Sequence, residues 1–245
     1  MTDTATHPTV AGPAVAGPAV TGPAVTGPAV TSRLHLLPQT NRLRSLHTVI
    51  RDRDASRADF VQTSAQIFRQ LLDTALDLLP VVPQQVRTPV GQTYHGLRPA
   101  APVCGVSIAR AGESMEGELR AMLPQTRIGK ILIQRDKTTK LPHFHYAALP
   151  PDIAMSQVLL LDPMLATGGT ALAALALLRE YGVFEEDVVF VTLLSSPEGI
   201  SAVHAQHPRV RIVTSAIEER LNADAYMVPG IGDFGDRYFG TDQPR

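Results

Sequence analysis

The sequence predicts an α/β protein with a mostly parallel central sheet and helices on both of its faces. Short apolar runs alternate with helical patterns between residues 102 and 214, and this alternation is typical of parallel sheets. One apolar run ends at an acidic residue and continues through a loop rich in Thr and Gly into a strong helical pattern. Ligands of such sheets bind at the carboxyl ends of the strands, at the switch point of the strand order. The residues that follow each predicted strand are therefore the candidate site residues.

The first predicted helix begins at a cap residue, Asp59 or Thr63, and runs through Leu79. Its apolar residues fall at helical spacing, and Pro80 follows as a stop signal. The next predicted elements are a buried strand over 102–109, a short helix over 113–122 and a strand over 128–134. Residues 137–151 are polar, and they predict a flexible loop or hairpin.

The second half of the chain contains the strongest helix signals. The helix that follows the Thr- and Gly-rich loop ends at Gly182, a residue well suited to follow a helix C-terminus. Ser196, Pro197 and Glu198 supply a cap, a first-turn proline and a first-turn acid, and so predict the start of another helix. Strands are predicted over 158–162, 187–194 and 210–214.

The N-terminal segment differs from the rest of the chain. Residues 11–30 are four pentapeptides that share Gly-Pro-Ala-Val. Proline at every fifth position interrupts helices and sheet ladders, and the repeat has too little apolar bulk to form a core. It also lacks the basic start and continuous apolar stretch of a secretory signal. We therefore expect residues 1–32 to be a disordered tail and residues 33–245 to form the functional domain.

Composition excludes several classes of function. The chain has 245 residues, 44% of them hydrophobic, and a formal net charge of −1. No basic excess marks it for nucleic acid or for an anionic membrane surface, and no apolar run approaches the ~20 residues of a membrane span. The single cysteine, Cys104, excludes an internal disulfide and a multi-cysteine metal site, and its apolar surroundings indicate a buried, inert thiol. We expect a cytoplasmic protein without nucleic-acid or membrane partners.

The loop after the predicted strand 158–162 is the most informative motif. Its backbone N–H groups and hydroxyls, together with the N-terminus of the following helix, can bind a phosphate. The acidic residue at the end of the strand can hold sugar hydroxyls, so the loop suits a ribose 5-phosphate. It lacks the Lys of the better-known nucleotide phosphate loop. A strand–helix turn with Gly for steric reasons alone is the open alternative. The loop consists of Asp162, Pro163, Met164, Leu165, Ala166, Thr167, Gly168, Gly169 and Thr170.

Two arginines follow other predicted strands. Arg110 comes directly after the strand 102–109, where its rigid fork of donors would suit diphosphate oxygens, and Gly112 would let a ligand approach the backbone. Arg135 follows the strand 128–134. His143 and His145 alternate with no carboxylate nearby, so we interpret them as part of a solvated strand in preference to a metal pair.

The C-terminal segment, residues 226–241, is rich in Gly and contains a Pro. This composition predicts a tight irregular loop without helix, and its free backbone groups would suit a planar base with alternating donors and acceptors.

The loop 162–170 and the segment 226–241 resemble those of the uracil phosphoribosyltransferases, and the resemblance covers roughly residues 33–245. It implies the type I phosphoribosyltransferase fold and transfer of phosphoribose from phosphoribosyl diphosphate (PRPP) to uracil, which forms UMP and diphosphate. By position, it implies PRPP contacts from Arg110, Arg135, the loop 162–170 and Asp233. It implies a uracil site built chiefly by backbone atoms of Met227, Gly232, Asp233 and Phe234.

The resemblance also implies a cofactor and partners. Pro163 stands where many phosphoribosyltransferases have a second acid, so Mg²⁺ is expected to arrive mainly on the diphosphate, with its protein ligands unknown. GTP controls some relatives and is a candidate allosteric effector, and a homo-oligomer, either a dimer or a tetramer, is expected. Two other readings stay open: a regulatory protein that binds PRPP or UMP without turnover, and a phosphoribosyltransferase for another base.

Overall fold

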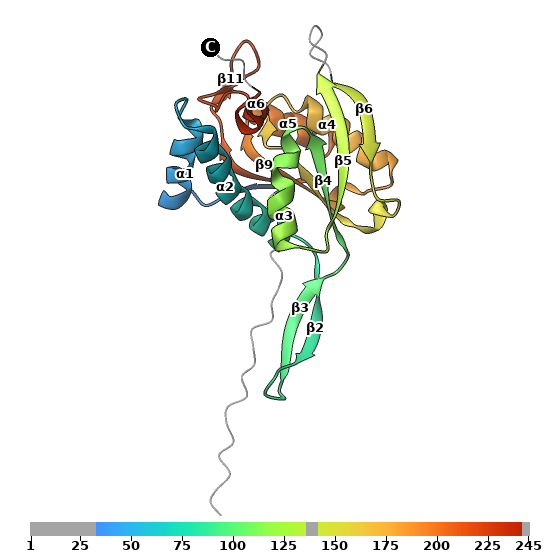
Figure 1. Cartoon of the computed structure of the whole chain (residues 1–245). Coiled ribbons are helices and arrows are strands. Elements are labelled where there is room, and N and C mark those ends of the chain that lie inside the picture. The colour runs from blue at the N-terminus through green and yellow to red at the C-terminus, as the bar shows by residue number, and fades with distance from the viewer. Residues whose placement is uncertain (1–32, 136–141, 242–245) are drawn as a thin grey trace, which may run out of the picture. The chain divides into compact units, whose positions relative to one another are not determined.

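The computed structural model of the chain describes residues 33–135 and 142–241. They form an α/β fold around an eight-stranded sheet (Figure 1). The main path of the sheet has the order β1-β10-β9-β7-β4-β5-β6, and β8 pairs with β9. The pairs from β1 through to β5 are parallel, and β6 is antiparallel to β5. The predicted mostly parallel sheet is therefore confirmed.

The strands of this sheet match the apolar runs of the sequence closely. The predicted strands appear as β4, β5, β7, β9 and β10, and β1 and β8 are two short additions that the sequence did not predict. The strand bounds are β1 Leu34–Leu36, β4 Val103–Ala109, β5 Arg127–Arg135, β6 Pro142–Ala148, β7 Gln157–Leu161, β8 Met164–Leu165, β9 Val188–Ser195 and β10 Arg211–Ile217.

Helices cover both faces of the sheet, as predicted (Figure 1). Along β7, Leu159 and Leu161 pack in one core with α1, α2 and α3, whereas Val158 and Leu160 pack in a second core with α4 and α5. This alternation follows from the strand's period of two, and it explains why the run is apolar throughout. The helix bounds are α1 Asn41–Arg51, α2 Arg57–Asp77, α3 Glu116–Met122, α4 Gly169–Glu180, α5 Pro197–Gln206 and α6 Phe234–Phe239.

Two helix starts differ from the prediction. The cap of α2 is Ser56, whose Oγ accepts a hydrogen bond from the N–H of Asp59 at 3.1 Å and donates to the Asp59 carboxylate. Asp59 is therefore the acid of the first turn and not the cap. Helix α1, which the sequence analysis did not predict, is capped by Thr40 through the N–H of Leu43. The predicted start of a helix at Ser196 and the predicted end of a helix at Gly182 are confirmed.

A separate two-stranded hairpin was missed. Strands β2 (Val81–Arg87) and β3 (Thr93–Pro99) pair only with each other within the described residues, and the hairpin extends away from the main sheet (Figure 1). Two further short strands, β11 (Arg220–Leu221) and β12 (Met227–Val228), form a second small ribbon. Short 3₁₀ turns at Ala111–Met115, Ile153–Met155 and Glu185–Asp187 complete the elements.

Two predicted segments lie wholly or partly outside the described residues. The predicted disordered tail, residues 1–32, lies outside the described residues. The predicted flexible segment 137–151 contains β6, which makes a hairpin with β5, and residues 136–141 again lie outside. Among the helices of the described ranges, none has the length and apolar character needed to span a bilayer.

Candidate functional site

The topological switch point lies between β4 and β7. These strands are parallel neighbours, with Ser107 opposite Leu161. The chain leaves β4 toward β5 on one side and leaves β7 toward β9 on the other. Connections that diverge in this way open a crevice at the carboxyl ends of the two strands. Arg110 and Asp162 are the first residues beyond β4 and β7, so the fold brings these two predicted site residues to the same edge of the sheet.

The first half of the loop 162–170 is fixed to the sheet. The carbonyl of Pro163 accepts hydrogen bonds from the N–H groups of Leu193 and Leu194 at 2.9 and 3.0 Å. Met164 and Leu165 form β8 against β9, and the Leu165 side chain is buried. Because their side chains face the protein, Pro163 and Leu165 serve as the scaffold of the loop.

The second half of the loop is accessible. Thr167 is exposed, Gly169 and Thr170 are half-buried, and all three surround the start of α4. Gly168 has a φ of +83°, and an added Cβ would lie 3.1 Å from the Cβ of Ala202. A left-handed backbone pressed against α5 therefore accounts for glycine at this position. The first N–H groups of α4 open beside the two threonines, which is an arrangement that can hold a phosphate.

Asp162 is almost fully buried at the end of β7, with 8% of its surface exposed. Its N–H donates to the carbonyl of Val191 at 3.3 Å, and its Oδ1 accepts a weak hydrogen bond from the N–H of Met164 at 3.4 Å. The strand end and the loop therefore orient this carboxylate at the switch point.

Arg110 is held by the C-terminal segment. Its Nη2 forms an ion pair with Asp236 Oδ1 at 3.0 Å, its Nη1 donates to Thr241 Oγ1 at 2.9 Å, and its guanidinium lies 5.2 Å from the centre of the Phe239 ring. The hydrogen bond from Thr241, followed by that from Arg110, holds the pKa of Asp236 below its usual value. The Arg110 side chain is 46% exposed, so an anionic ligand can reach it.

Gly112 is required by the packing of the fold. It is buried, and an added Cβ would lie 2.1 Å from the carbonyl oxygen of Leu161. Glycine is therefore needed because the turn after β4 packs directly on the end of β7, and the approach of a ligand to its backbone stays a prediction. This contact brings the Arg110 turn close to Asp162.

The segment predicted to bind uracil, residues 227–234, is called the base segment below. Met227 is buried in β12, Gly232 and Asp233 are exposed, and Gly230 and Gly232 have φ values of +67° and +77°. Asp233 caps α6, since its Oδ1 accepts from the N–H of Asp236 at 2.8 Å. The prediction that residues 226–241 form an irregular loop without helix is therefore wrong beyond Asp233, because this cap compensates for Gly235.

Phe234 points into the core. It is 2% exposed, and its ring lies 5.4 to 6.0 Å from those of Phe60, Phe68 and Tyr238. Any contact of Phe234 with a base must therefore come from its main chain.

The side chains of Arg135 and His143 are not described, and the described residues hold no cluster of metal ligands. The backbone of Arg135 ends β5 opposite Pro142, but its side chain lies outside the described residues. His143 is likewise not described beyond its backbone. In the part of the chain that the structure describes, no group of three or more His, Cys, Asp or Glu side chains could hold a metal ion.

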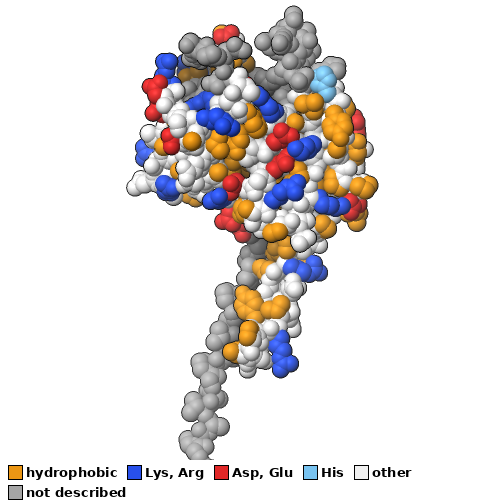
Figure 2. Space-filling model, in the orientation of Figure 1, with side chains coloured by type: hydrophobic (Ala, Val, Ile, Leu, Met, Phe, Trp, Pro, Cys, Tyr) orange, Lys and Arg blue, Asp and Glu red, His pale blue; other side chains and the backbone are white. Residues whose placement is uncertain are grey.

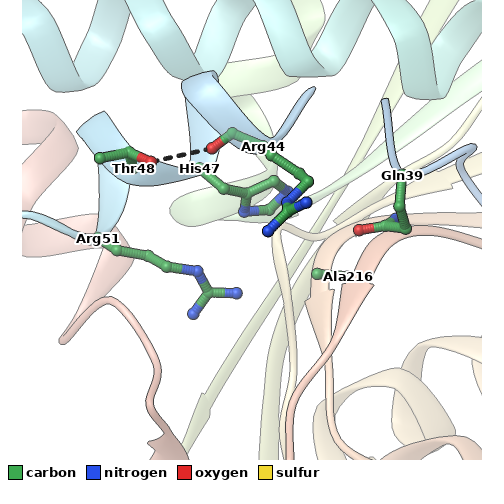
Figure 3. Close-up of a pocket in the computed structure, with 6 residues that line it drawn as sticks. All are labelled: Gln39, Arg44, His47, Thr48, Arg51 and Ala216. Carbon is green, nitrogen blue, oxygen red and sulfur yellow. Dashed lines mark hydrogen bonds between the residues drawn. The ribbon is translucent and has the colours of Figure 1, made fainter. Parts of the chain in front are cut away.

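A small basic pocket lies beside α1 (Figure 3). It has a volume of about 230 Å³ and is lined by Gln39, Arg44, His47, Thr48, Arg51 and Ala216. Burial, and next the charge of Arg51, lower the pKa of His47 to about 4, so this histidine is neutral at pH 7. Arg51 reaches from this pocket to Glu218 and to the base segment. The sequence analysis missed this pair because the two residues are 167 positions apart.

The fold, with its switch-point loop and arginine turn, is that of the type I phosphoribosyltransferases, as predicted. The family model for uracil phosphoribosyltransferase matches residues 37–241. The chain therefore belongs to the uracil phosphoribosyltransferase family.

Individual relatives agree with this assignment. The uracil phosphoribosyltransferase of Dictyostelium discoideum is 51% identical over 207 residues, which cover 84% of this chain and 96% of that protein. The uracil phosphoribosyltransferase of Saccharomyces cerevisiae is 50% identical over 206 residues, which cover 84% and 95%. Among solved structures, the AQ2163 protein from Aquifex aeolicus matches with a TM-score of 0.77 and 28% identity, over 86% of this chain and all of that one.

Proposed function

We propose that the protein transfers the phosphoribosyl group of PRPP to uracil and forms UMP and diphosphate. The observation that carries the proposal is membership of the uracil phosphoribosyltransferase family along 37–241, a range that includes the switch-point loop and the base segment. The decisive experiment measures UMP formation from uracil and PRPP with Mg²⁺. A regulatory protein that only binds PRPP or UMP would show binding without product.

The proposed mechanism uses positioning and electrostatics without a covalent nucleophile. Diphosphate leaves the anomeric carbon of PRPP while the uracil nitrogen approaches, so positive charge grows on the sugar and negative charge on the leaving group. Thr167 to Thr170 and the start of α4 would hold the 5-phosphate, and Asp162 would hold the ribose hydroxyls. Arg110 and Arg135 would stabilise the departing diphosphate.

Arg110 would share its donors with the diphosphate, or exchange its present partners, in this role. Its guanidinium now binds Asp236, Thr241 and the face of Phe239. A diphosphate carries more negative charge than one carboxylate, so it would compete for the same fork of donors. Because Asp236 lies in α6, directly after the base segment, this exchange would link PRPP binding to the segment proposed to hold uracil.

We propose Mg²⁺ as the metal of the reaction. Asp162 is the carboxylate at the loop start, and Pro163 follows it where a second acid would help to hold a cation. Mg²⁺ retains waters and binds readily through phosphate oxygens, so a metal carried by the diphosphate fits this donor set. Bound there, the metal would neutralise the developing charge of the leaving group. Its removal with a chelator should abolish turnover.

We propose that uracil is read by main-chain groups of the base segment. Gly232 and Asp233 are exposed, whereas the Met227 and Phe234 side chains are buried. A site made of backbone groups has a fixed pattern of donors and acceptors, which suits one pyrimidine edge. A phosphoribosyltransferase for another base would require a different pattern, so a comparison of uracil with other bases tests this point.

We also propose that the protein is a homo-oligomer, a dimer or a tetramer. The hairpin β2–β3 exposes large apolar side chains on both of its faces, among them Val86 and Tyr94 on one and Val81 and Leu97 on the other. Figure 2 shows hydrophobic side chains along the face of the hairpin turned toward the viewer. Isolated hairpins are marginally stable and exposed apolar patches mark interfaces, so a second copy is the occupant we propose. Light scattering should give a molar mass that is a multiple of 26.3 kDa. The double variant Tyr94→Ser with Leu97→Ser should have a lower molar mass in solution.

Two further proposals concern an allosteric effector and the location of the protein. The family resemblance makes GTP the candidate allosteric effector, which is tested by assaying UMP formation with and without GTP. We also propose a cytoplasmic location, because a chain with a single cysteine has no internal disulfide that would require an oxidising compartment; localisation of the tagged protein would test this.

A further inference from the structure

We propose that the ion pair between Arg51 and Glu218 positions the base segment and thereby sets the affinity of the protein for the base. This inference rests on the proposed function, because the base segment is assigned to uracil there. It adds two positioning residues that lie outside the segment itself, one in α1 and one just after β10.

The two side chains bind both main-chain groups of Gly230. Glu218 Oε2 accepts a hydrogen bond from the Gly230 N–H at 2.7 Å, and Arg51 Nη1 donates to the Gly230 carbonyl at 3.2 Å. Between themselves, Arg51 and Glu218 form a two-pronged pair, with distances of 3.0 Å to Oε2 and 2.5 Å to Oε1. The Glu218 side chain is 1% exposed and that of Arg51 is 25% exposed. Gly230 is therefore held through both of its main-chain groups, which belong to two successive peptides, by a largely buried charged pair.

The backbone conformation at position 230 restricts the residue type there to glycine. Its φ is +67°, and an added Cβ would lie 2.2 Å from the carbonyl oxygen of Met227. The turn is therefore tight and accepts only glycine. Gly232 and Asp233 follow within three residues, so we infer that their position depends on how Arg51 and Glu218 hold Gly230.

A second arginine ties the same segment to the same helix. Arg237 in α6 donates to the carbonyl of Ile231 at 2.8 Å, and to the carbonyls of Ile50 and Asp52 at 2.6 Å each. Arg51 thus reaches from α1 to the main chain of Gly230. Arg237 reaches from α6 both to the main chain of Ile231 and to the end of α1. Figure 3 shows Arg51 on this helix, beside His47 and the basic pocket.

The chemistry of the pair fits positioning better than simple stabilisation. Burial alone would raise the pKa of Glu218, but the hydrogen bonds from Arg51 and Gly230 and the charge of Arg51 outweigh it and hold the pKa below its usual value. A buried pair offsets most of its own desolvation cost, so its net effect on stability is small. What the pair supplies is directional: a fixed acceptor for the N–H of Gly230 and a fixed donor for its carbonyl.

The test compares two conservative variants with a matched control. Glu218→Gln keeps the shape and removes the charge, and Arg51→Lys keeps the charge and removes the fork. Arg211→Lys is the control, because Arg211 is also buried and also binds carbonyls, those of Leu78 and Glu186, away from the base segment. Thermal unfolding confirms that each variant is folded.

We expect Glu218→Gln to raise the uracil KM at saturating PRPP by about tenfold or more, and Arg51→Lys to raise it less. PRPP affinity without uracil should change by less than about twofold in both. Hydrogen exchange of the Gly230 amide should become faster, and Arg211→Lys should change neither the uracil KM nor this exchange rate.

Unchanged exchange at Gly230, or equal losses for uracil and PRPP, would overturn the inference, as would a similar rise in uracil KM in Arg211→Lys. Failure of the proposed function is distinguishable, because the wild-type protein would then form no UMP whatever the exchange rate of Gly230.

Discussion

At the residue scale, we propose that the fold places Asp162 to hold the ribose hydroxyls. It is nearly buried at the carboxyl end of β7, and a buried position with a purely structural role would favour an apolar residue. Asp162→Asn keeps an oxygen for the N–H of Met164 and removes the charge. We expect kcat/KM to fall about a hundredfold, ~2.7 kcal/mol, with an unchanged melting temperature. Asp152→Asn, which affects an exposed pair with Arg127, is the control; full activity of folded Asp162→Asn would contradict the assignment.

Arg110 permits a second prediction at this scale. A lysine retains the charge but cannot bind Asp236 and Thr241 with one fork, nor two diphosphate oxygens. Arg110→Lys should therefore weaken PRPP binding far more than uracil affinity measured at saturating PRPP. Initial-rate kinetics with each substrate varied in turn check this. Equal losses for both substrates would indicate that Arg110 acts only by holding the C-terminal segment.

His47 links a residue to the pH dependence of stability. Ser215 Oγ donates to the Leu193 carbonyl at 2.6 Å, so it must accept from His47 Nε2, 3.1 Å away. His47 Nδ1 is then the bare nitrogen, and it is buried without a hydrogen-bond partner. Protonation would leave a buried, unpaired N–H beside Arg51. The pKa of His47 is lowered from 6.5 to about 4 in the folded state for this reason.

The sign of the effect follows from linkage. Between pH 6.5 and 4 the unfolded chain binds a proton at His47 and the folded chain does not, so stability falls as the pH falls through this range. Urea unfolding at pH 7, 6 and 5 should show a steeper loss in the wild type than in His47→Gln. The exposed His95→Gln variant should follow the wild type. Parallel curves for all three proteins would show that His47 does not contribute.

At the scale of elements, we propose that the base segment determines which base fits. Uracil presents an acceptor–donor–acceptor edge, whereas cytosine changes the pattern at two positions. Fixed main-chain groups cannot rotate to suit both, and each mismatch costs roughly 1–3 kcal/mol. We expect discrimination against cytosine on the order of a thousandfold and acceptance of 5-fluorouracil, which keeps the edge. Rates on the three bases at saturating PRPP measure this, and similar rates on uracil and cytosine would rule out backbone reading.

Phe234 tests the same element from the side of the core. Its ring packs among three aromatic rings. Phe234→Ala should therefore lower the free energy of unfolding by about 3–5 kcal/mol, which is a large share of that of a typical domain. Phe234→Leu is the gentler variant. Because its main-chain N–H remains, we expect the preference for uracil over cytosine to persist while uracil affinity falls. A loss of preference would mean that the aromatic ring itself takes part in base recognition.

Two of the strands that the sequence predicted, β7 and β9, are buried on both faces. They are mostly apolar because each contacts two helix layers, and such runs are recognisable in a sequence. The hairpin β2–β3 was missed because both of its faces are exposed, so its side chains carry no regular alternation. Helix α6 was missed because Gly235 argues against a helix, and only the Asp233 cap reveals why one forms there.

At the scale of the whole molecule, the site is assembled from distant parts of the chain. The residues after β4 and β7 could be paired in advance, because the switch-point rule applies to any sheet of this kind. The partners Arg110–Asp236 and Arg51–Glu218 could not, because 126 and 167 positions separate them and nothing local marks either pair. Motifs thus predict the groups that meet a ligand, and only the fold identifies the groups that orient them.

The extent of the working molecule can be tested by truncation. β1 begins at Leu34 and pairs with β10, with Leu34 opposite Ile212, and Leu37 is buried directly after it. Deletion of residues 2–31 stops short of this strand and removes only the repeat, which has little apolar surface to bury. We therefore expect an unchanged melting temperature and kcat.

Deletion of residues 2–37 is the matched control for this truncation. It removes the ladder between β1 and β10 and the buried side chain of Leu37, so it should lower the melting temperature markedly. Thermal unfolding and initial rates of both truncated proteins make the comparison. A large loss of stability in the shorter deletion would show that the repeat packs on the domain, because no strand of the sheet begins before Leu34 in the described residues.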